Sequence, residues 1–162
     1  MNLRTGQGID FHRLGKGLKL WLGGIPIPSD KGCIAHSDGD VLIHSICDAI
    51  LGASASGDIG HHFPDTSEEF RNIDSKLLLE KTREIISKKG FSVVNVDSTV
   101  CLENPKIAPF IPEMRSVISS ILRISPEDVS VKATTTEKMG FVGRGEGIVA
   151  MASVLLKHQE KR

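Results

Sequence analysis

Aromatic side chains are scarce in this chain of 162 residues, which contains six Phe, one Trp and no Tyr. So few rings leave little for the stacking platforms on which proteins hold single-stranded nucleic acids. An excess of positive charge is also missing, because 20 Lys and Arg balance 20 Asp and Glu. A general binder of nucleic acid or of anionic membranes needs such an excess. We therefore expect neither as a partner, and the zero net charge favours self-association.

Cysteines and long apolar runs are also few. Cys33, Cys47 and Cys101 are odd in number and have no CxxC spacing, which favours reduced thiols over a disulfide framework or a zinc ribbon. No apolar run reaches the roughly 18 residues of a membrane-spanning helix, and no basic segment followed by an apolar stretch opens the chain. We therefore expect a cytoplasmic protein of the bacterial type, without a signal or transit peptide.

The length predicts a single domain over residues 1–162, with an ordinary hydrophobic content of 40%. Apolar patterns and capping residues predict strands, helices and a glycine-turned hairpin. The strands are expected at 3–11, 91–102, 129–135 and 147–157, the hairpin at 21–26, and the helices at 39–53, 75–89 and 109 or 111 to 124. A long Gly/His/Pro/Asp-rich loop at 57–72 is plausible as a binding loop or lid.

These elements predict an α+β fold, with about four strands in one sheet and three helices on one face. The last strand, residues 147–157, is apolar on both of its faces. One face can pack on the helices, and few elements remain to cover the other. A subunit interface is the natural cover for that second face.

Asp10 and His12 are separated by one residue at an expected strand end, so their side chains share a face. A carboxylate and an imidazole projecting together suit Zn²⁺. His44, on a polar stripe of the first helix, is the best third ligand. Three protein ligands leave a fourth position open, which is typical of a catalytic zinc site. The alternative is that Asp10 and His12 are simply exposed at the strand end.

Other polar residues surround this candidate centre in the sequence. Asp40 and Asp48 lie one helical turn on either side of His44, so either could orient its ring or contact substrate. His36 could be a fourth ligand, a phosphate contact or an ordinary polar loop residue.

A second group of chemistry-bearing residues follows the strand expected at 129–135. The run from Ala133 to Lys138 joins three threonine hydroxyls to a carboxylate and an ammonium group. Hydroxyls and backbone amides can hold phosphate oxygens, and Glu137 could bind a hard divalent ion between two phosphates. The alternative is that the threonines only fill a strand.

Two weaker signals accompany this run. The glycine-rich segment 140–147 does not match a known nucleotide-binding loop, so it is only a weak signal for nucleotide binding. A salt bridge between Arg144 and Glu146 explains these two charged residues equally well. Lys106 follows a strand end, where a lysine can reach an anion or simply remain solvated.

Five blocks together resemble the 2-C-methyl-D-erythritol 2,4-cyclodiphosphate synthase family. They are the segments 8–12, 35–40, 57–66 with 104–106, 131–138 and 140–147, and they follow in order over nearly the whole chain. One departure is Ile9, which stands where many members carry an aromatic residue near a threefold axis. It leaves open whether an isoprenoid diphosphate binds in an axial cavity.

The resemblance implies a homotrimer with active sites at subunit boundaries and one Zn²⁺ per site. It assigns zinc to Asp10, His12 and His44, transition-state stabilisation to His36 and Thr135, and a second divalent ion, Mg²⁺ or Mn²⁺, to Glu137. Further residues fall on substrate contacts: Ser37, Asp58, Ile59, Gly60, Phe63, Pro64, Asp65, Thr66, Ser67, Lys106, Ala133, Thr134, Thr136, Phe141 and Arg144.

The implied reaction converts 4-diphosphocytidyl-2-C-methyl-D-erythritol 2-phosphate, a CDP-linked small molecule, into the 2,4-cyclodiphosphate and CMP. It would make the chain a phosphorus–oxygen lyase of non-mevalonate isoprenoid biosynthesis. Two alternatives belong to other classes. A metal-dependent phosphoesterase would use water in place of the substrate phosphate and yield a linear product, and a trimeric nucleotide-binding regulator would bind CMP or CDP without turnover.

Overall fold

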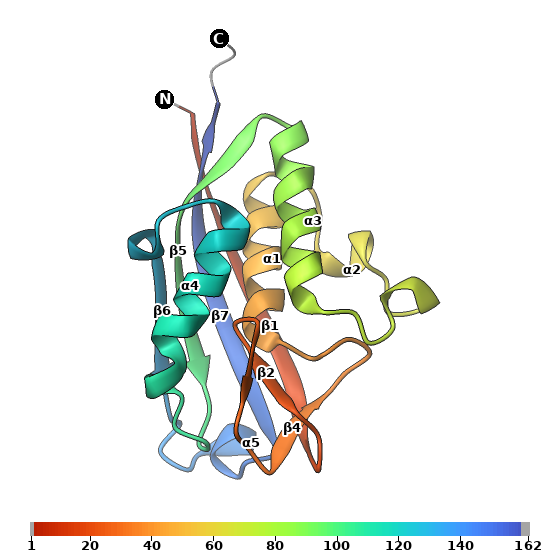
Figure 1. Cartoon of the computed structure of the whole chain (residues 1–162), viewed down its shortest axis with the longest axis vertical. Coiled ribbons are helices and arrows are strands. Elements are labelled where there is room, and N and C mark those ends of the chain that lie inside the picture. The colour runs from red at the N-terminus through yellow and green to blue at the C-terminus, as the bar shows by residue number, and fades with distance from the viewer. Residues whose placement is uncertain (1, 160–162) are drawn as a thin grey trace.

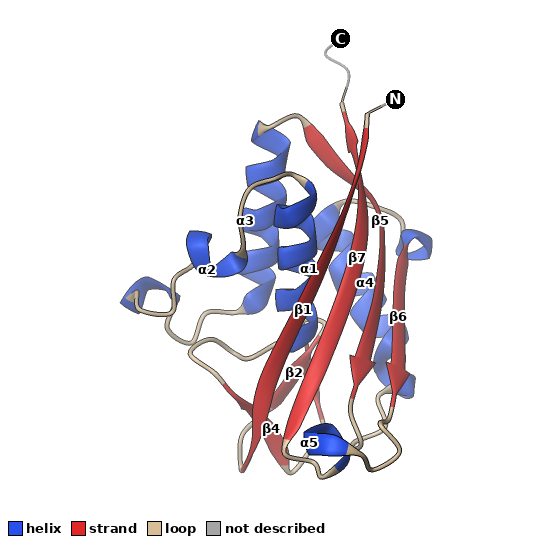
Figure 2. Ribbon diagram, turned by 180° about the vertical axis from the view of Figure 1, so that it is seen from behind, coloured by secondary structure: helices blue, strands red, loops and turns tan. Residues whose placement is uncertain are grey.

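The computed structural model describes residues 2–159, and its main feature is one sheet with helices on a single face (Figure 1). Seen from behind, the other face of the sheet carries no helical layer within the described residues (Figure 2). Five strands form this sheet in the order β4-β1-β7-β5-β6. Their bounds are β1 Leu3–Lys16, β4 Lys31–Ile34, β5 Phe91–Cys101, β6 Val129–Thr134 and β7 Gly147–His158. The hairpin strands β2 Leu20–Leu22 and β3 Ile25–Ile27 form a separate two-stranded sheet.

The sheet is mixed, because β5 and β6 run parallel while the other neighbours are antiparallel. The expected α+β class is confirmed, but the expectation of about four strands was too low. The fifth strand, β4, pairs with the far end of β1, from Arg13↔Ile34 to Lys16↔Lys31. This pairing extends β1 beyond residue 11, so Asp10 and His12 lie within a strand and not at its end.

Three long helices cover the sheet, and their positions agree closely with the expected ranges. They are α1 Val41–Ala53, α3 Ser75–Lys88 and α4 Ile111–Leu122. Shorter helical turns occur in the connections: α2 Ile59–His62, α5 Gly140–Gly143 and 3₁₀ turns at Glu68–Phe70, Ala108–Phe110 and Pro126–Asp128. Two of these turns lie in the segment expected to be a continuous loop at 57–72. Among residues 2–159, no helix combines the length and apolar character that crossing a membrane requires.

Helix α1 lies unusually close to β1, and two glycines make this approach possible. A Cβ on Gly6 would lie 2.0 Å from the Ala49 carbonyl oxygen, and one on Gly8 would lie 2.0 Å from that of Ser45. Both distances are far shorter than any van der Waals contact, so neither position accepts a side chain while α1 stays in place. The glycines share a face of β1 with Asp10 and His12. The close packing therefore brings α1 against the two candidate ligands.

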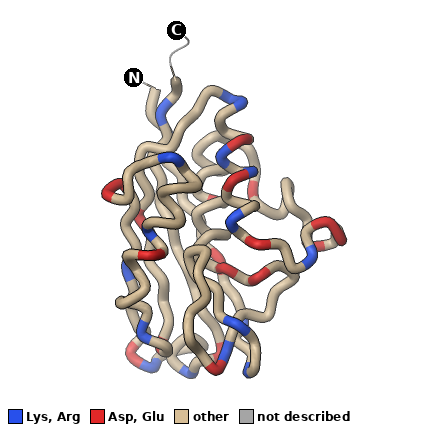
Figure 3. The backbone as a smooth tube through the Cα atoms, viewed as in Figure 1, with Lys and Arg blue, Asp and Glu red and all other residues tan. Residues whose placement is uncertain are grey.

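The opposite face of the sheet exposes apolar side chains. Ile9 and Phe11 on β1 are 50% and 54% exposed, and Met151 on β7, which pairs with Ile9, is 44% exposed. The alternate residues of β7, including Ile148 and Ala150, are buried against the helices. The expectation that β7 packs on the helices with one face only is confirmed. Charged residues of both signs are interspersed along the chain, and their numbers balance (Figure 3).

Candidate active site

Asp10, His12 and His44 meet where β1 passes α1. The ligand atoms of the three side chains all lie within 4.8 Å of one another. His44 Nδ1 is 3.1 Å from Asp10 Oδ2 and 3.2 Å from His12 Nε2, and His12 Nε2 is 3.4 Å from Asp10 Oδ2. The predicted trio is therefore assembled by the fold, although its members are separated by 34 residues of chain.

These distances fit a tetrahedral metal ion. Zinc binds imidazole nitrogen and carboxylate oxygen at about 2.0–2.1 Å, so neighbouring ligands of a tetrahedral site lie about 3.3 Å apart. Two imidazole nitrogens that face each other at 3.2 Å are also better satisfied by a shared cation than by each other, because each presents a lone pair once its other nitrogen carries the proton. The donor set and the spacing therefore suit Zn²⁺.

The remaining ring nitrogens have partners that fix which nitrogen is protonated. His12 Nδ1 donates to the carbonyl oxygen of Phe11 at 2.8 Å, which leaves Nε2 free for a metal. His44 Nε2 donates to Ser75 Oγ at 2.9 Å, and Ser75 Oγ in turn donates to the Asp38 carboxylate. Such outer partners orient metal-binding imidazoles.

The prediction that Asp40 or Asp48 orients the His44 ring by a hydrogen bond is wrong, and their contact with substrate stays a prediction. Both carboxylates accept backbone N–H groups instead. Asp40 accepts from Gly23, Gly24 and Ile43 at 2.6–3.0 Å, and Asp48 accepts from Ile59 at 2.7 Å. The partners of His44 Nε2 are Ser75 Oγ at 2.9 Å, which begins α3 and lies 31 residues away, and Ser37 Oγ at 3.3 Å. Neither residue belongs to α1, so helical spacing could not predict them.

Burial and charge act in opposite directions on the two histidines. Burial lowers the pKa of His12 below its ordinary value, and Asp10 offsets only part of this effect. Burial also lowers the pKa of His44, but the hydrogen bond and charge of Asp10, with Asp40 and Asp38, raise it by more, so the net shift is upward. The carboxylates that favour a proton on His44 favour a metal cation in the same place.

A pocket of about 440 Å³ opens beside the trio. Its polar side contains His36 and Ser37, and His36 Nε2 donates to the carbonyl oxygen of Ser67 at 3.2 Å. Among the described residues, His36 is not part of the three-ligand cluster. Of the other predicted site residues, the pocket includes Ile59, Gly60, Phe63 and Asp65.

The pocket also contains residues that the sequence reasoning missed. Phe70, Ile73 and Leu78 form an apolar side together with Phe63, whose ring stands edge-to-face with that of Phe70 at 5.5 Å. Their position around the long loop was the only available signal, since each is an ordinary apolar residue in sequence. The pocket therefore has a polar end at the candidate metal ligands and an apolar wall.

The loop that carries Asp58 is anchored to α1. Asp58 caps α2 by accepting from the His61 N–H at 2.8 Å, while Asp48 of α1 accepts the Ile59 N–H. Ser67 caps the next turn, and its carbonyl oxygen accepts from His36. Pro64 and Thr66 lie between these anchors, next to Asp65 in the pocket wall.

The second group of predicted residues lies elsewhere in the chain. Phe11 of β1, Val149 of β7, Cys101 of β5 and Thr134 of β6 form one row across the sheet. Three strand spacings separate the ends of this row, about 14 Å. Thr135 and Glu137 follow β6, where Thr135 Oγ1 donates to Glu137 Oε1 at 3.1 Å. Ala133, Thr136 and exposed Lys106 belong to the same end of β5 and β6, and not to the pocket at the trio.

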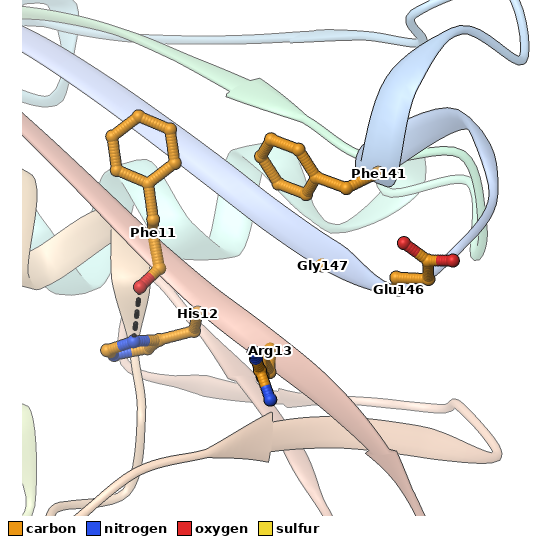
Figure 4. Close-up of a pocket in the computed structure, with 6 residues that line it drawn as sticks. All are labelled: Phe11, His12, Arg13, Phe141, Glu146 and Gly147. Carbon is orange, nitrogen blue, oxygen red and sulfur yellow. Dashed lines mark hydrogen bonds between the residues drawn. The ribbon is translucent and has the colours of Figure 1, made fainter.

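A different pocket, of about 510 Å³, opens at the other face of β1. Phe11 and Phe141 face each other across it with ring centres 6.2 Å apart, while His12 points to the opposite side of the strand (Figure 4). Glu146 at its edge forms two hydrogen bonds with Arg144, at 2.9 and 3.0 Å. The salt bridge considered for Arg144 is thus present.

Comparison with known proteins gives the family. The model of the YgbB family matches residues 3–157. The chain belongs to the YgbB family. Over 160 residues it is 56% identical to the 2-C-methyl-D-erythritol 2,4-cyclodiphosphate synthase of Phocaeicola vulgatus, covering 99% of this chain and 100% of that protein.

Solved structures of the family have the same fold. The bifunctional IspDF from Campylobacter jejuni is 43% identical with a TM-score of 0.94, and the match covers 98% of this chain but only 43% of that longer protein. The IspF of Plasmodium falciparum in its CDP complex is 36% identical with a TM-score of 0.85, and the match covers 98% of each chain. The resemblance found in the sequence is confirmed over its full extent.

Proposed function

We propose that the pocket beside Asp10, His12 and His44 is where this family member carries out the cyclodiphosphate synthase reaction. The substrate is 4-diphosphocytidyl-2-C-methyl-D-erythritol 2-phosphate. Its 2-phosphate oxygen forms a bond to the β-phosphorus, and the bond from that phosphorus to the CMP oxygen breaks. The observation that carries this assignment is the near-tetrahedral spacing of the trio, 3.1–3.4 Å, in a pocket that also has apolar lining residues.

The trio would hold one Zn²⁺. A zinc ion supplies positive charge and Lewis acidity to a phosphate oxygen. Asp10 contributes the one negative charge among the three ligands, and the Ser75–Asp38 pair keeps His44 in the tautomer that offers Nδ1. The nucleophile is already an anion, so the reaction needs no strong general base.

The methylerythritol part fits the pocket wall. Ser37 offers a hydroxyl to phosphate oxygens, and His36 would donate its Nε2–H to them in place of the Ser67 carbonyl oxygen. Asp65 offers a carboxylate to hydroxyl groups of the polyol. Phe63 and its apolar neighbours suit the methyl group, because burying a methyl against them removes it from water. Asp58, Ile59, Gly60, Pro64, Thr66 and Ser67 shape the loop that closes this side.

The turn after β6 is the proposed nucleotide half of the site. Ala133, Thr134, Thr136 and Lys106 would contact the cytidine, and Thr135 would donate a hydrogen bond to phosphate oxygens as charge moves to the leaving CMP. Glu137 would hold the second divalent ion, Mg²⁺ or Mn²⁺, to which its exposed carboxylate is suited. Phe141 and Arg144 would complete the rim of the phosphate site.

One chain keeps these two halves about 14 Å apart, whereas a diphosphate group is much shorter. This separation supports a homotrimer in which the trio of one chain works with the nucleotide half of its neighbour. The exposed apolar residues on β1 and β7 support the same assembly, because burying them would offset the cost of association. The CDP complex of the Plasmodium falciparum relative supports a CDP-linked substrate.

The test uses His44→Ala and phosphorus NMR of the product. The unchanged protein should yield the cyclic diphosphate, and the variant should lose both zinc and cyclisation. A linear product would indicate a phosphoesterase, and CDP binding without turnover a regulator. Full cyclisation by protein verified as zinc-free would overturn the metal assignment.

A further inference from the structure

We propose that Glu103 is a positioning residue for the proposed nucleotide half: its carboxylate holds the turn from Thr135 to Lys138 in the shape that presents Thr135 and Glu137 to the phosphates. This inference rests on the function proposed above. Glu103 follows β5, and the turn it contacts follows β6, the neighbouring parallel strand. Two segments separated by more than thirty residues are thus joined through one side chain.

The contacts of Glu103 converge on one oxygen. Glu103 Oε1 accepts from the Thr136 N–H at 2.8 Å and from the Lys138 N–H at 3.2 Å, and it lies 3.2 Å from Thr136 Oγ1, whose proton has a shorter acceptor in the Met139 carbonyl oxygen at 2.7 Å. These donors lie on either side of Glu137. The carboxylate therefore hydrogen-bonds to the two residues that flank Glu137, the proposed ion ligand, and does not itself bind the exposed Glu137 side chain.

The turn from Thr135 to Lys138 has an unfavourable backbone conformation that the hydrogen bonds of Glu103 would stabilise. Glu137 and Lys138 both have positive φ angles, 51° and 62°. Residues with a Cβ rarely adopt this region, and two in succession are costlier still. Strained backbone of this kind persists only where its surroundings hold it, and it gathers at functional sites. Two backbone N–H groups that donate to one carboxylate oxygen supply that support here.

In this turn, the side chains of Thr135 and Glu137 form a hydrogen-bonded pair at the surface. Thr135 Oγ1 donates to Glu137 Oε1 at 3.1 Å, across a turn in which Glu137 has a positive φ angle. A turn that relaxed to ordinary φ angles would move the Glu137 carboxylate away from Thr135. Thr135, the proposed hydrogen-bond donor, and Glu137, the proposed ion ligand, would then no longer act on the same oxygen atoms of the substrate phosphates.

The charge of Glu103 also connects two predicted segments. The N–H groups of Thr136 and Lys138, with Lys106 nearby, hold the pKa of Glu103 below its ordinary value. The side chain is therefore an anion at neutral pH, and it stands between the turn and the Asn104–Lys106 segment. One residue so placed can order both segments that the proposed cytidine site requires.

The experiment compares Glu103→Ala with Glu103→Gln and with Glu113→Ala, a change at an exposed glutamate of α4. Affinity for CDP in the presence of Mg²⁺ is measured by calorimetry, and zinc affinity by competition with a chelator. Glu103→Ala should weaken CDP binding roughly 10- to 100-fold, in line with the loss of several hydrogen bonds. Glu103→Gln keeps a carbonyl oxygen as acceptor and should stay within about threefold.

Two further readouts separate positioning from general damage. Zinc affinity should be unchanged in both Glu103 variants, and the Mg²⁺ concentration needed for half-maximal turnover should rise only in Glu103→Ala. If that variant does not fold, Glu103→Asp, whose carboxylate is one methylene shorter and reaches less far toward the turn, should still weaken CDP binding several-fold.

Wild-type CDP affinity in Glu103→Ala, or in Glu103→Asp, overturns the proposal. So does an equal loss in the Ala and Gln variants, since charge and not hydrogen-bond geometry would then be the cause. Failure of the proposed function is a separate result: unchanged protein that forms no cyclic diphosphate refutes the function, whatever the Glu103 variants do to CDP binding.

Discussion

At the residue scale, the histidines of the trio depend on partners that do not touch the metal position. His12 relies on the Phe11 carbonyl of its own strand, while His44 relies on Ser75 of another helix. The first partner is local and any sequence would provide it. The second exists only because α3 begins beside α1, so it is the more informative one to change.

Ser75→Ala should lower zinc affinity by roughly 10- to 100-fold, because His44 loses the acceptor that fixes its tautomer and ring orientation. Competition with a chromogenic chelator measures the change. Ser87→Ala, at an exposed position of the same helix, is the control and should bind zinc as the unchanged protein does. Equal affinities for the two variants would show that Ser75 has no part in zinc binding.

At the element scale, the packing of α1 on β1 sets where His44 stands. Gly8 faces Ser45, the residue that follows His44, and leaves no space for a Cβ. A methyl group at this position must push the helix away from the strand. The geometry of the trio is therefore coupled to the absence of a side chain two residues before Asp10.

Gly8→Ala should destabilise the fold by about 1–3 kcal/mol and should weaken zinc binding as His44 moves away from Asp10. Urea unfolding and chelator competition measure the two effects. Gly52→Ala, within α1, is the matched control, since its Cβ would come no closer than 3.9 Å to Gln7 O and alanine favours a helix. Undiminished zinc affinity in Gly8→Ala would contradict the coupling.

The caps of the two helices at the site differ in burial. Asp40 caps α1 with no exposed surface and accepts three backbone N–H groups. Asp74 caps α3 at a partly exposed position and accepts from the Lys76 N–H. The buried cap therefore joins the hairpin turn at Gly23 and Gly24 to the start of α1.

Asp40→Ala should cost roughly 3 kcal/mol or more of unfolding free energy, because it leaves buried N–H groups without an acceptor. Asp74→Ala should cost about 1 kcal/mol, the usual value for an accessible cap. Urea denaturation of both variants provides the comparison. Similar losses in the two would mean that the contacts of Asp40 with the hairpin add nothing to its role as a cap.

At the scale of the whole molecule, the uncovered sheet face is the main unexplained surface of a single chain. It presents Ile9, Phe11 and Met151 on neighbouring strands. The proposed trimer would cover this face and bring the trio of one chain toward the nucleotide half of another. Assembly and activity should therefore be lost together.

Met151→Lys should prevent assembly, since a charge buried without a partner in an apolar interface is costly. Light scattering should give a trimer mass for the unchanged protein and a lower mass for the variant, with loss of turnover. Leu77→Lys is the control: Leu77 is 49% exposed, close to the 44% of Met151, but lies on α3. A monomeric unchanged protein with full activity would refute the shared site.

Local rules determined much of this protein. The period of a strand places Asp10 and His12 on one face, and capping residues with apolar spacing located α1 and α3 to within one or two residues. Residue types alone led to the prediction that the run from Thr134 to Glu137 binds phosphate, and this stays a prediction. Each of these predictions depends on neighbours a few positions away, which is the range over which sequence periodicity acts.

Only the tertiary structure decided which distant residues meet. The contact of Ser75 with His44, the apolar wall of Phe70, Ile73 and Leu78, and the hold of Glu103 on the turn after β6 all join segments from different elements. No spacing rule predicts them, because they depend on how closely helices pack on the sheet and on which strands become neighbours. The ligands were visible in the sequence, whereas the surroundings that orient them came from packing.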